Sequence, residues 1–222
     1  MVTWSLIDTV LLDMDGTLLD LHFDNHFWQQ FVPQKYAEKH GLSVEESQKQ
    51  LFPRFKAQYG TLNWYCLDYW SQQLDLNIVA LKRELQHLIR MRVDALHFLQ
   101  SLANSNKQVW MVTNAHPHAL ALKLERTAIA PYFQRIISSH EFGKPKEFLQ
   151  FWHELQQYLH FDPRRTLFID DSEAVLETAQ RFGIEHILSI SHPDSLAPER
   201  TGLKFPAINQ FAEILPIEDM LC

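Results

Sequence analysis

The chain has 222 residues, of which 46% are hydrophobic and 21% are charged, and its formal net charge is −7. This length allows one sizeable core, or a core with a modest second domain, and the composition is typical of a globular protein and argues against wholesale disorder. The negative charge and the lack of a basic run disfavour a nucleic-acid polymer as a partner, whereas a small anionic substrate remains compatible with them.

The first predicted element is a β-strand at Asp8–Asp13, which leads into Asp13-Met14-Asp15-Gly16-Thr17. Alternation along a strand would place Asp13 and Asp15 on the same side, at the strand's carboxyl end. Ligands bind at this edge in parallel α/β sheets. Carboxylates this close repel each other unless a hard cation binds or one stays protonated, and both arrangements suit phosphate chemistry. A simple Asp-Gly turn would explain Asp15 and Gly16 but not the earlier acid.

The next segment, residues 19–91, lacks a convincing strand and is rich in aromatic side chains. Its periodicity is helical, as in Leu81, Leu85 and Leu88. An excursion of roughly seventy residues is far too long for a βα loop. We therefore expect a helical cap domain at 19–91, inserted after the first strand of a core formed by residues 1–18 and 92–222.

Further strand-like runs follow, and helical patterns separate most of them. They are Gln108–Thr113, Gln134–Ser138, Thr166–Asp170 and Glu185–Ile190. Helices are expected at Phe148–Leu159 and Glu173–Phe182, and Gly183 is placed as the C-cap of the second. This alternation predicts an α/β fold with a doubly wound parallel sheet.

Thr113 and Asn114 end the second predicted strand. Their hydroxyl and amide could form an anion cradle with the backbone N–H groups of the next helix. The competing interpretation is that they simply cap that helix. A lysine in the later sequence Gly143-Lys144-Pro145-Lys146 could neutralise a phosphate or orient a carboxylate, although a lone lysine is usually a solvated surface group.

Asp170 and Asp171 end the fourth predicted strand. Adjacent strand residues point to opposite faces, so we expect only one of them to reach the site, where it would complete an oxygen-ligand set for Mg²⁺. The alternative is that Asp171 or Ser172 caps the following helix.

Taken together and in this order, these motifs resemble those of the haloacid dehalogenase-like phosphohydrolase superfamily over essentially the whole chain. The resemblance implies a Rossmann-like sheet, a small helical cap and Mg²⁺ as cofactor. It also implies that Asp13 is the nucleophile that forms an aspartyl-phosphate. Asp15 would be the general acid and base, and its backbone carbonyl would also bind the metal.

The resemblance further implies that Thr113 and Asn114 bind phosphate. Asp171 would ligate the metal, with Asp170 as an outer or alternative ligand. The family's catalytic and phosphate-binding lysine is matched by Lys146, which lies at the usual distance from Gly143. The alternative is Lys144, because it precedes a proline, as the family's lysine usually does.

The aromatic run at residues 61–70 and the sequence Thr113-Asn114-Ala115-His116-Pro117-His118 look like the bacterial GMP/IMP nucleotidase branch of the family. This implies a phosphomonoesterase acting on purine nucleoside 5′-monophosphates. The alternative is another small phosphomonoester, such as phosphoglycolate or a sugar phosphate. The presence of Asp15 argues against dehalogenation, and retention of both acids argues against a non-catalytic module.

Trp64, Tyr65 or Tyr69 could stack on a purine base, although filling the core of the cap is the main expectation for each. His116 and His118 could contact substrate, but we expect them chiefly as surface residues at a helix start. The 12 histidines show no zinc-ligand spacing.

The chain's two cysteines, Cys66 and Cys222, form no metal-ligand or disulfide pattern, which favours a reducing compartment. Residues 1–8 carry no signal-peptide pattern, and no apolar run is long enough to cross a bilayer. We therefore expect a cytoplasmic monomer or weak homodimer without a membrane partner.

Overall fold

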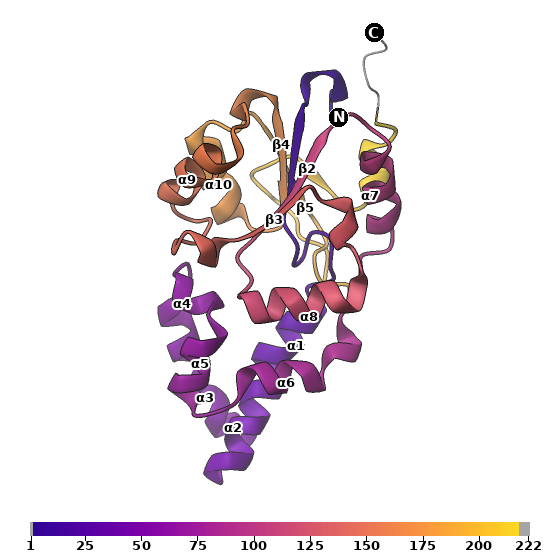
Figure 1. Cartoon of the computed structure of the whole chain (residues 1–222). Helices are drawn as coiled ribbons and strands as arrows, with labels where there is room; N and C mark the ends of the chain where they lie inside the picture. Colours follow the sequence, from indigo (N-terminus) through magenta and orange to yellow (C-terminus); the bar gives the residue numbers. More distant parts are fainter. Residues whose placement is uncertain (1, 218–222) are drawn as a thin grey trace.

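A parallel sheet forms the centre of the computed structural model, which describes residues 2–217 (Figure 1). Its six strands run in the order β3-β2-β1-β4-β5-β6, and every neighbouring pair is parallel. The strands are β1 Thr9–Leu12, β2 Gln108–Thr113, β3 Arg135–Ser138, β4 Thr166–Asp170, β5 His186–Ile190 and β6 Ala207–Ile208. The predicted α/β class and the five predicted strands are confirmed. The edge strand β6 was missed because two residues are too short to carry a periodic signal.

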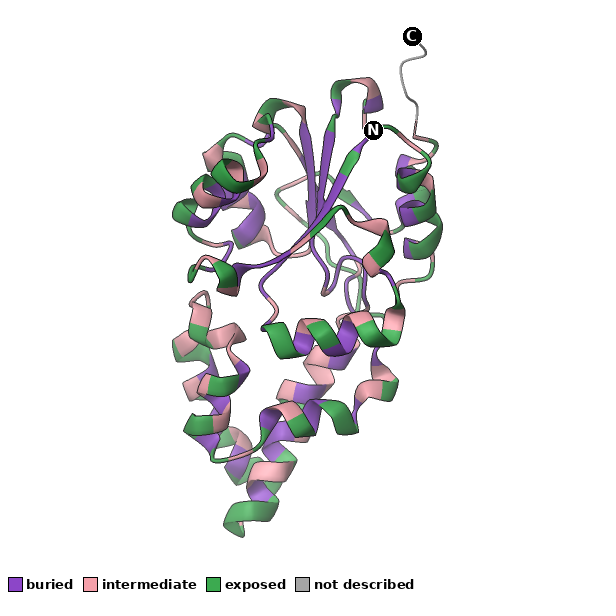
Figure 2. Ribbon diagram, in the orientation of Figure 1, coloured by how far each residue is buried: buried purple, intermediate pink, exposed green. Residues whose placement is uncertain are grey.

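Helices cover both faces of the sheet. They are α7 Ala95–Ala103, α9 Leu149–Leu159 and α10 Glu173–Phe182, whereas α8 Pro117–Thr127 lies at the carboxyl ends of the strands (Figure 1). In β1, Leu11 packs with α9 and α10, whereas Val10 and Leu12 belong to the larger cluster on the other face that includes α7. Both faces are therefore apolar, and the central strands are almost wholly buried, as Figure 2 shows. Gly183 ends α10 in the left-handed conformation predicted for a C-cap.

The segment between β1 and α7 is helical, as expected. Its elements are α1 His22–His26, a π-helical turn at Phe27–Phe31, α2 Val32–His40, α3 Val44–Gln58, α4 Leu62–Tyr65, α5 Leu67–Leu74 and α6 Ile78–Glu84. A capping box between Ser43 and Glu46 starts α3. The rings of Phe55 and Trp70 pack edge to face, with centroids 5.0 Å apart.

This helical insertion lies beyond the carboxyl ends of the strands (Figure 1). The chain enters and leaves it side by side, because Leu19 and Met91 form an isolated antiparallel bridge. The insertion can therefore fold over the strand ends while the sheet stays continuous. Its status as a separate domain at residues 19–91 stays a prediction.

Short 3-10 turns complete the fold, at Trp4–Leu6, Gln86–Leu88, Ala130–Tyr132, Ser139–Glu141, Pro163–Arg165 and Phe211–Ile214. Within residues 2–217, no helix combines the length and the apolar character needed to span a membrane. Cys66 is a free thiol, and Cys222 lies outside the described residues.

Candidate active site

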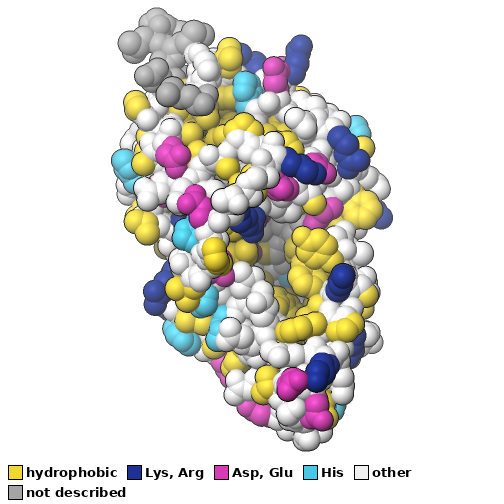
Figure 3. Space-filling model, turned by 180° about the vertical axis from the view of Figure 1, so that it is seen from behind, with side chains coloured by type: hydrophobic (Ala, Val, Ile, Leu, Met, Phe, Trp, Pro, Cys, Tyr) yellow, Lys and Arg dark blue, Asp and Glu magenta, His cyan; other side chains and the backbone are white. Residues whose placement is uncertain are grey.

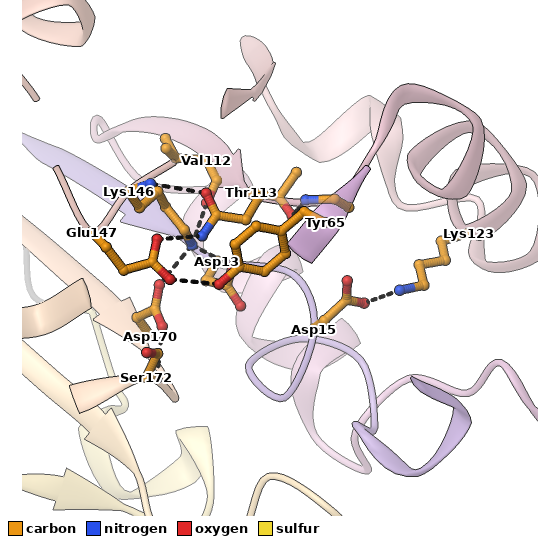
Figure 4. Close-up of polar contacts among 12 residues, drawn as sticks. Asp13, Asp15, Tyr65, Val112, Thr113, Lys123, Lys146, Glu147, Asp170 and Ser172 are labelled. Atoms are coloured by element: carbon orange, nitrogen blue, oxygen red, sulfur yellow. Dashed lines mark hydrogen bonds and ion pairs between the residues drawn. The ribbon is translucent and has the colours of Figure 1, made fainter. Parts of the chain in front are cut away.

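The carboxyl ends of β1 and β4 bring Asp13 and Asp170 to the two sides of one buried lysine. Lys146 Nζ lies 2.5 Å from Asp13 Oδ1 and 2.7 Å from Asp170 Oδ2, and it donates a third hydrogen bond to the Val112 carbonyl at 3.0 Å (Figure 4). Its side chain is only 2% exposed. Lys144 is exposed. Of the two candidate lysines, Lys146 is therefore the one that reaches the strand ends.

Asp171 joins this cluster as well, so the expectation that only one of the adjacent acids reaches the site is wrong. Carboxylate oxygens of Asp13, Asp170 and Asp171 all lie within 4.8 Å of one another. The reason is that β4 ends at Asp170, so that strand alternation no longer governs Asp171. The alternative that Asp171 or Ser172 caps α10 is not supported either, because the residue at the cap position, Ser172, makes no side-chain hydrogen bond to the helix.

The three carboxylates fit a hard divalent cation. Asp13 Oδ2 is buried and has no hydrogen-bond partner among the described residues, which leaves a lone pair free for a ligand. Burial raises the pKa of Asp13 to about 6, with the Asp170 carboxylate adding to the rise against the effect of Lys146. Burial and the Asp170 and Asp13 charges also raise the pKa of Asp171. An oxygen-only set of this kind matches Mg²⁺ chemistry.

Gly16 allows Asp171 to approach the loop after β1. Its φ of +84° lies in the left-handed region, and a Cβ built there would lie 2.7 Å from Asp171 Cγ and Oδ2. Glycine is therefore required at this position both by the backbone and by the close contact.

Asp15 belongs to a different set of charges, which sequence reasoning missed. It points away from the Lys146 cluster, toward Lys123 on α8 (Figure 4). Lys123 Nζ lies 2.6 Å from Asp15 Oδ1 and 2.6 Å from Asp24 Oδ2, and Lys82 binds the other Asp24 oxygen at 2.7 Å. Asp13 and Asp15 thus both lie at the carboxyl edge of the sheet, but Asp13 pairs with Lys146 and Asp15 pairs with Lys123.

The charges in this second set perturb one another strongly. Burial raises the pKa of Asp15 to about 6, against the effect of the Lys123 ammonium. Burial also acts to raise the pKa of Asp24, but Lys123 and Lys82 outweigh it and hold that pKa well below its usual range. Asp24 is therefore ionised, and Asp15 is the acid of this set whose pKa lies nearer to neutral pH.

Thr113 ends β2 and Asn114 follows it, but neither caps α8, because the cap position is His116. Asn114 Oδ1 accepts a hydrogen bond from Lys146 N at 2.9 Å, and its Nδ2 donates to Glu147 Oε2 at 3.0 Å. The Thr113 hydroxyl accepts from Ala115 N at 3.0 Å. Asn114 therefore holds the lysine loop in place.

Glu147 is a further residue that no sequence signal indicated. Its Oε1 accepts a 2.6 Å hydrogen bond from the Tyr65 hydroxyl of α4 (Figure 4). With the Asn114 contact, Tyr65, Glu147 and Asn114 form a chain from the insertion to the strand ends. This chain closes the insertion over one side of the site.

The two acid-lysine sets line one cavity of about 920 Å³ between the sheet edge and the insertion. The core contributes the predicted residues Asp13, Asp15, Thr113, Asn114, His116, Lys146, Asp170 and Asp171, together with Arg200. Figure 3 shows the hollow, with hydrophobic side chains at its edge. Trp64 and Tyr65 line the cavity, whereas Tyr69 packs against Trp70 at 5.0 Å. The expectation of a surface position holds for His118 but is wrong for His116, which is buried.

The parallel sheet, the acids and lysine at its carboxyl edge and the helical insertion agree with the family that the sequence motifs resemble. The family model described as haloacid dehalogenase-like hydrolase matches residues 7–183. The chain belongs to the haloacid dehalogenase-like hydrolase family.

One similar curated relative is the GMP/IMP nucleotidase YrfG of Escherichia coli (strain K12). It is 44% identical over 215 residues, which are 97% of either chain. Among solved structures, a HAD phosphatase from Thermococcus onnurineus is similar in fold, with a TM-score of 0.78, 20% identity and coverage of 94% of this chain and 96% of that one. The L-2-haloacid dehalogenase from Xanthobacter autotrophicus has a TM-score of 0.62, 16% identity and the same coverage.

Proposed function

We propose that this chain is a Mg²⁺-dependent phosphomonoesterase that hydrolyses purine nucleoside 5′-monophosphates such as GMP and IMP. The observation that carries the proposal is the buried cluster of Asp13, Lys146, Asp170 and Asp171, which opens into the large cavity under the helical insertion. A phosphoryl group needs both a nucleophile and positive charge around its oxygens, and this cluster offers both.

Asp13 is the proposed nucleophile. Its carboxylate oxygen forms a bond to phosphorus while the bond from phosphorus to the 5′ oxygen breaks, which gives an aspartyl-phosphate. Asp15, as the acid, donates its proton to the leaving oxygen. In the second step Asp15, as the base, takes a proton from the water that attacks phosphorus. The bond from phosphorus to the Asp13 oxygen breaks, which frees the carboxylate and inorganic phosphate.

Lys146 and the proposed metal ligands balance the charge. The Lys146 ammonium lies against Asp13 before substrate binds and remains there to neutralise the phosphoryl oxygens. Asp13, Asp171 and the Asp15 backbone carbonyl are the proposed Mg²⁺ ligands, with Asp170 as an outer or alternative ligand. When bound, Mg²⁺ would offset the repulsion between the phosphate and the carboxylates.

Thr113 and Asn114 are proposed to bind the phosphate, Thr113 through its hydroxyl and the two residues together through the loop that they order. His116 lies in the same cavity and is a further candidate contact.

The nucleoside is proposed to lie against the insertion. Trp28, Phe55, Tyr59 and Trp64 give the cavity an aromatic wall, which suits a planar base. The 44% identity to a protein described as a GMP/IMP nucleotidase supports this class of substrate. The alternative is a phosphatase for another small phosphomonoester, such as phosphoglycolate or a sugar phosphate.

Phosphate release tests the proposal. GMP, IMP, AMP, phosphoglycolate and several sugar phosphates are compared with and without Mg²⁺. We expect fastest turnover of GMP and IMP, dependence on Mg²⁺, and no turnover by Asp13→Asn. The exposed Asp75→Asn variant is the matched control and should keep wild-type rates. Efficient turnover of sugar phosphates without turnover of purine nucleotides would contradict the nucleotidase proposal.

A further inference from the structure

A second group of potential metal ligands lies apart from the carboxylates, where the helical insertion meets the core. Cys66, His116 and His140 each offer one ligand atom, and these atoms all lie within 4.8 Å of one another. Cys66 lies between α4 and α5, His116 directly precedes α8, and His140 lies in the turn after β3. These three residues are far apart in sequence, which explains why they form no recognisable zinc-ligand spacing.

His140 provides the observation that points to a ligand. Its Nε2 atom is buried and has no hydrogen-bond partner among the described residues. A buried polar atom left unsatisfied is destabilising, and a bound cation would use its lone pair. Burial, together with His116, lowers the pKa of His140 to about 4, so the ring is neutral at physiological pH. Neutral imidazole is the form that ligates a metal.

His116 and Cys66 face the same point. The His116 and His140 rings meet edge to face, with centroids 5.0 Å apart. His116 Nδ1 accepts only a weak 3.4 Å contact from His118 N. A cation bound at Nε2 would move the ring proton to Nδ1 and replace this contact. Cys66 Sγ accepts a 3.4 Å contact from Tyr69 N at the start of α5.

Asp68 adds a carboxylate beside the three ligands. Its Oδ2 lies 3.5 Å from His116 Nε2, and its side chain is 72% exposed, so it is free to turn toward a bound ion. Carboxylates next to ligating imidazoles are common in metal sites, where they orient the ring or complete the ligand set.

We propose that Cys66, His116 and His140 bind one Zn²⁺-like divalent cation, with Asp68 or water in the fourth position. Thiolate and imidazole are the ligands that Zn²⁺ prefers, whereas Mg²⁺ prefers oxygen. Zn²⁺ would therefore bind at the cysteine and histidines, and Mg²⁺ at the carboxylates. Cys66 comes from the insertion and both histidines come from the core. Binding therefore ties the insertion to the strand ends beside the catalytic cavity.

Equilibrium dialysis of the full chain tests the proposal. The protein is stripped with a chelator, held in excess Mg²⁺ and titrated with Zn²⁺ alone. We expect the wild type to bind one Zn²⁺ per chain. The affinity for Zn²⁺ should fall at least about tenfold in Cys66→Ser and in His140→Ala. The matched controls Cys222→Ser and His97→Ala should bind as the wild type does, and Asp13→Asn should also keep its Zn²⁺.

Co²⁺ gives a second readout on the unmodified protein, because a Co²⁺–thiolate bond absorbs in the near ultraviolet. We expect this band in the wild type and in Cys222→Ser, and its loss in Cys66→Ser. Circular dichroism shows whether each variant is folded. Absence of the thiolate band in the wild type, or equal Zn²⁺ binding by folded Cys66→Ser and wild type, would overturn the proposal.

Discussion

Replacing Gly16 with alanine should lower the stability of the fold only modestly but weaken Mg²⁺ binding strongly. The φ of +84° places the new side chain in the left-handed region, which costs about 1–2 kcal/mol for a residue other than glycine. In a chain of this length, 1 kcal/mol corresponds to about 2–4 °C, so Tm should fall by about 2–8 °C. The added Cβ would also lie 2.7 Å from Asp171 Cγ and Oδ2, so the carboxylate has to move.

The activity assay measures what this displacement does. Phosphate release from GMP is followed over a range of Mg²⁺ concentrations, and we expect Gly16→Ala to need at least about tenfold more Mg²⁺. Gly41→Ala is the matched control, because Gly41 has φ +67° and no heavy atom within 4 Å of its added Cβ. It should lose similar stability but keep the wild-type Mg²⁺ dependence. Wild-type Mg²⁺ dependence in Gly16→Ala would refute the role proposed for Asp171.

Three further predictions concern the buried charges and the closure of the insertion. Burial raises the pKa of Asp13 and Asp15 to about 6, so the folded metal-free protein binds more protons than the unfolded chain, whose carboxyls titrate near 4. In EDTA the free energy of unfolding from urea titrations should therefore fall as pH rises from about 4 to about 7, more steeply than in Asp13→Asn, and identical slopes would contradict the cause given. Lys123→Met leaves two buried carboxylates short of a partner and should cost about 3–5 kcal/mol in the same titrations, against no more than about 0.5 kcal/mol for the exposed Lys49→Met. Tyr65→Phe removes the hydrogen bond to Glu147, worth about 1–1.5 kcal/mol, and should raise KM about five- to tenfold. The exposed Tyr158→Phe should leave KM unchanged, and an unchanged KM in Tyr65→Phe would show that this contact does not hold the insertion over substrate.

The strand ends could be predicted because their signal is local. Apolar runs that stop at Asp13, Thr113 and Asp170 mark both the sheet and its ligand edge, and the structure places all three there. Strand alternation failed at Asp171 because that rule applies only while the strand continues. Spacing from Gly143 favoured Lys146 over Lys144, and the fold separates the two, because Lys146 is buried at the strand ends and Lys144 is exposed.

The remaining features depend on contacts between distant segments. Lys123, on α8, meets Asp24 of the insertion, and Glu147 meets Tyr65, yet none of these residues belongs to a local pattern. From sequence alone, a lysine on an amphipathic helix is expected to be exposed to solvent. Only the fold shows that a partner from another element buries it. The sequence alone therefore predicted which edge carries the chemistry, but not how the insertion is joined to it.

Detection of the phosphorylated residue tests the central claim most directly. Asp15→Asn, which lacks the proposed base for the second step, is mixed with p-nitrophenyl phosphate, whose good leaving group does not need the proposed acid, and is quenched in acid before mass spectrometry. We predict one phosphoryl group per chain, on the peptide that contains Asp13, and none in the Asp13→Asn, Asp15→Asn double variant. A phosphoryl group on another residue, or release of p-nitrophenol without any covalent phosphate, would contradict the account.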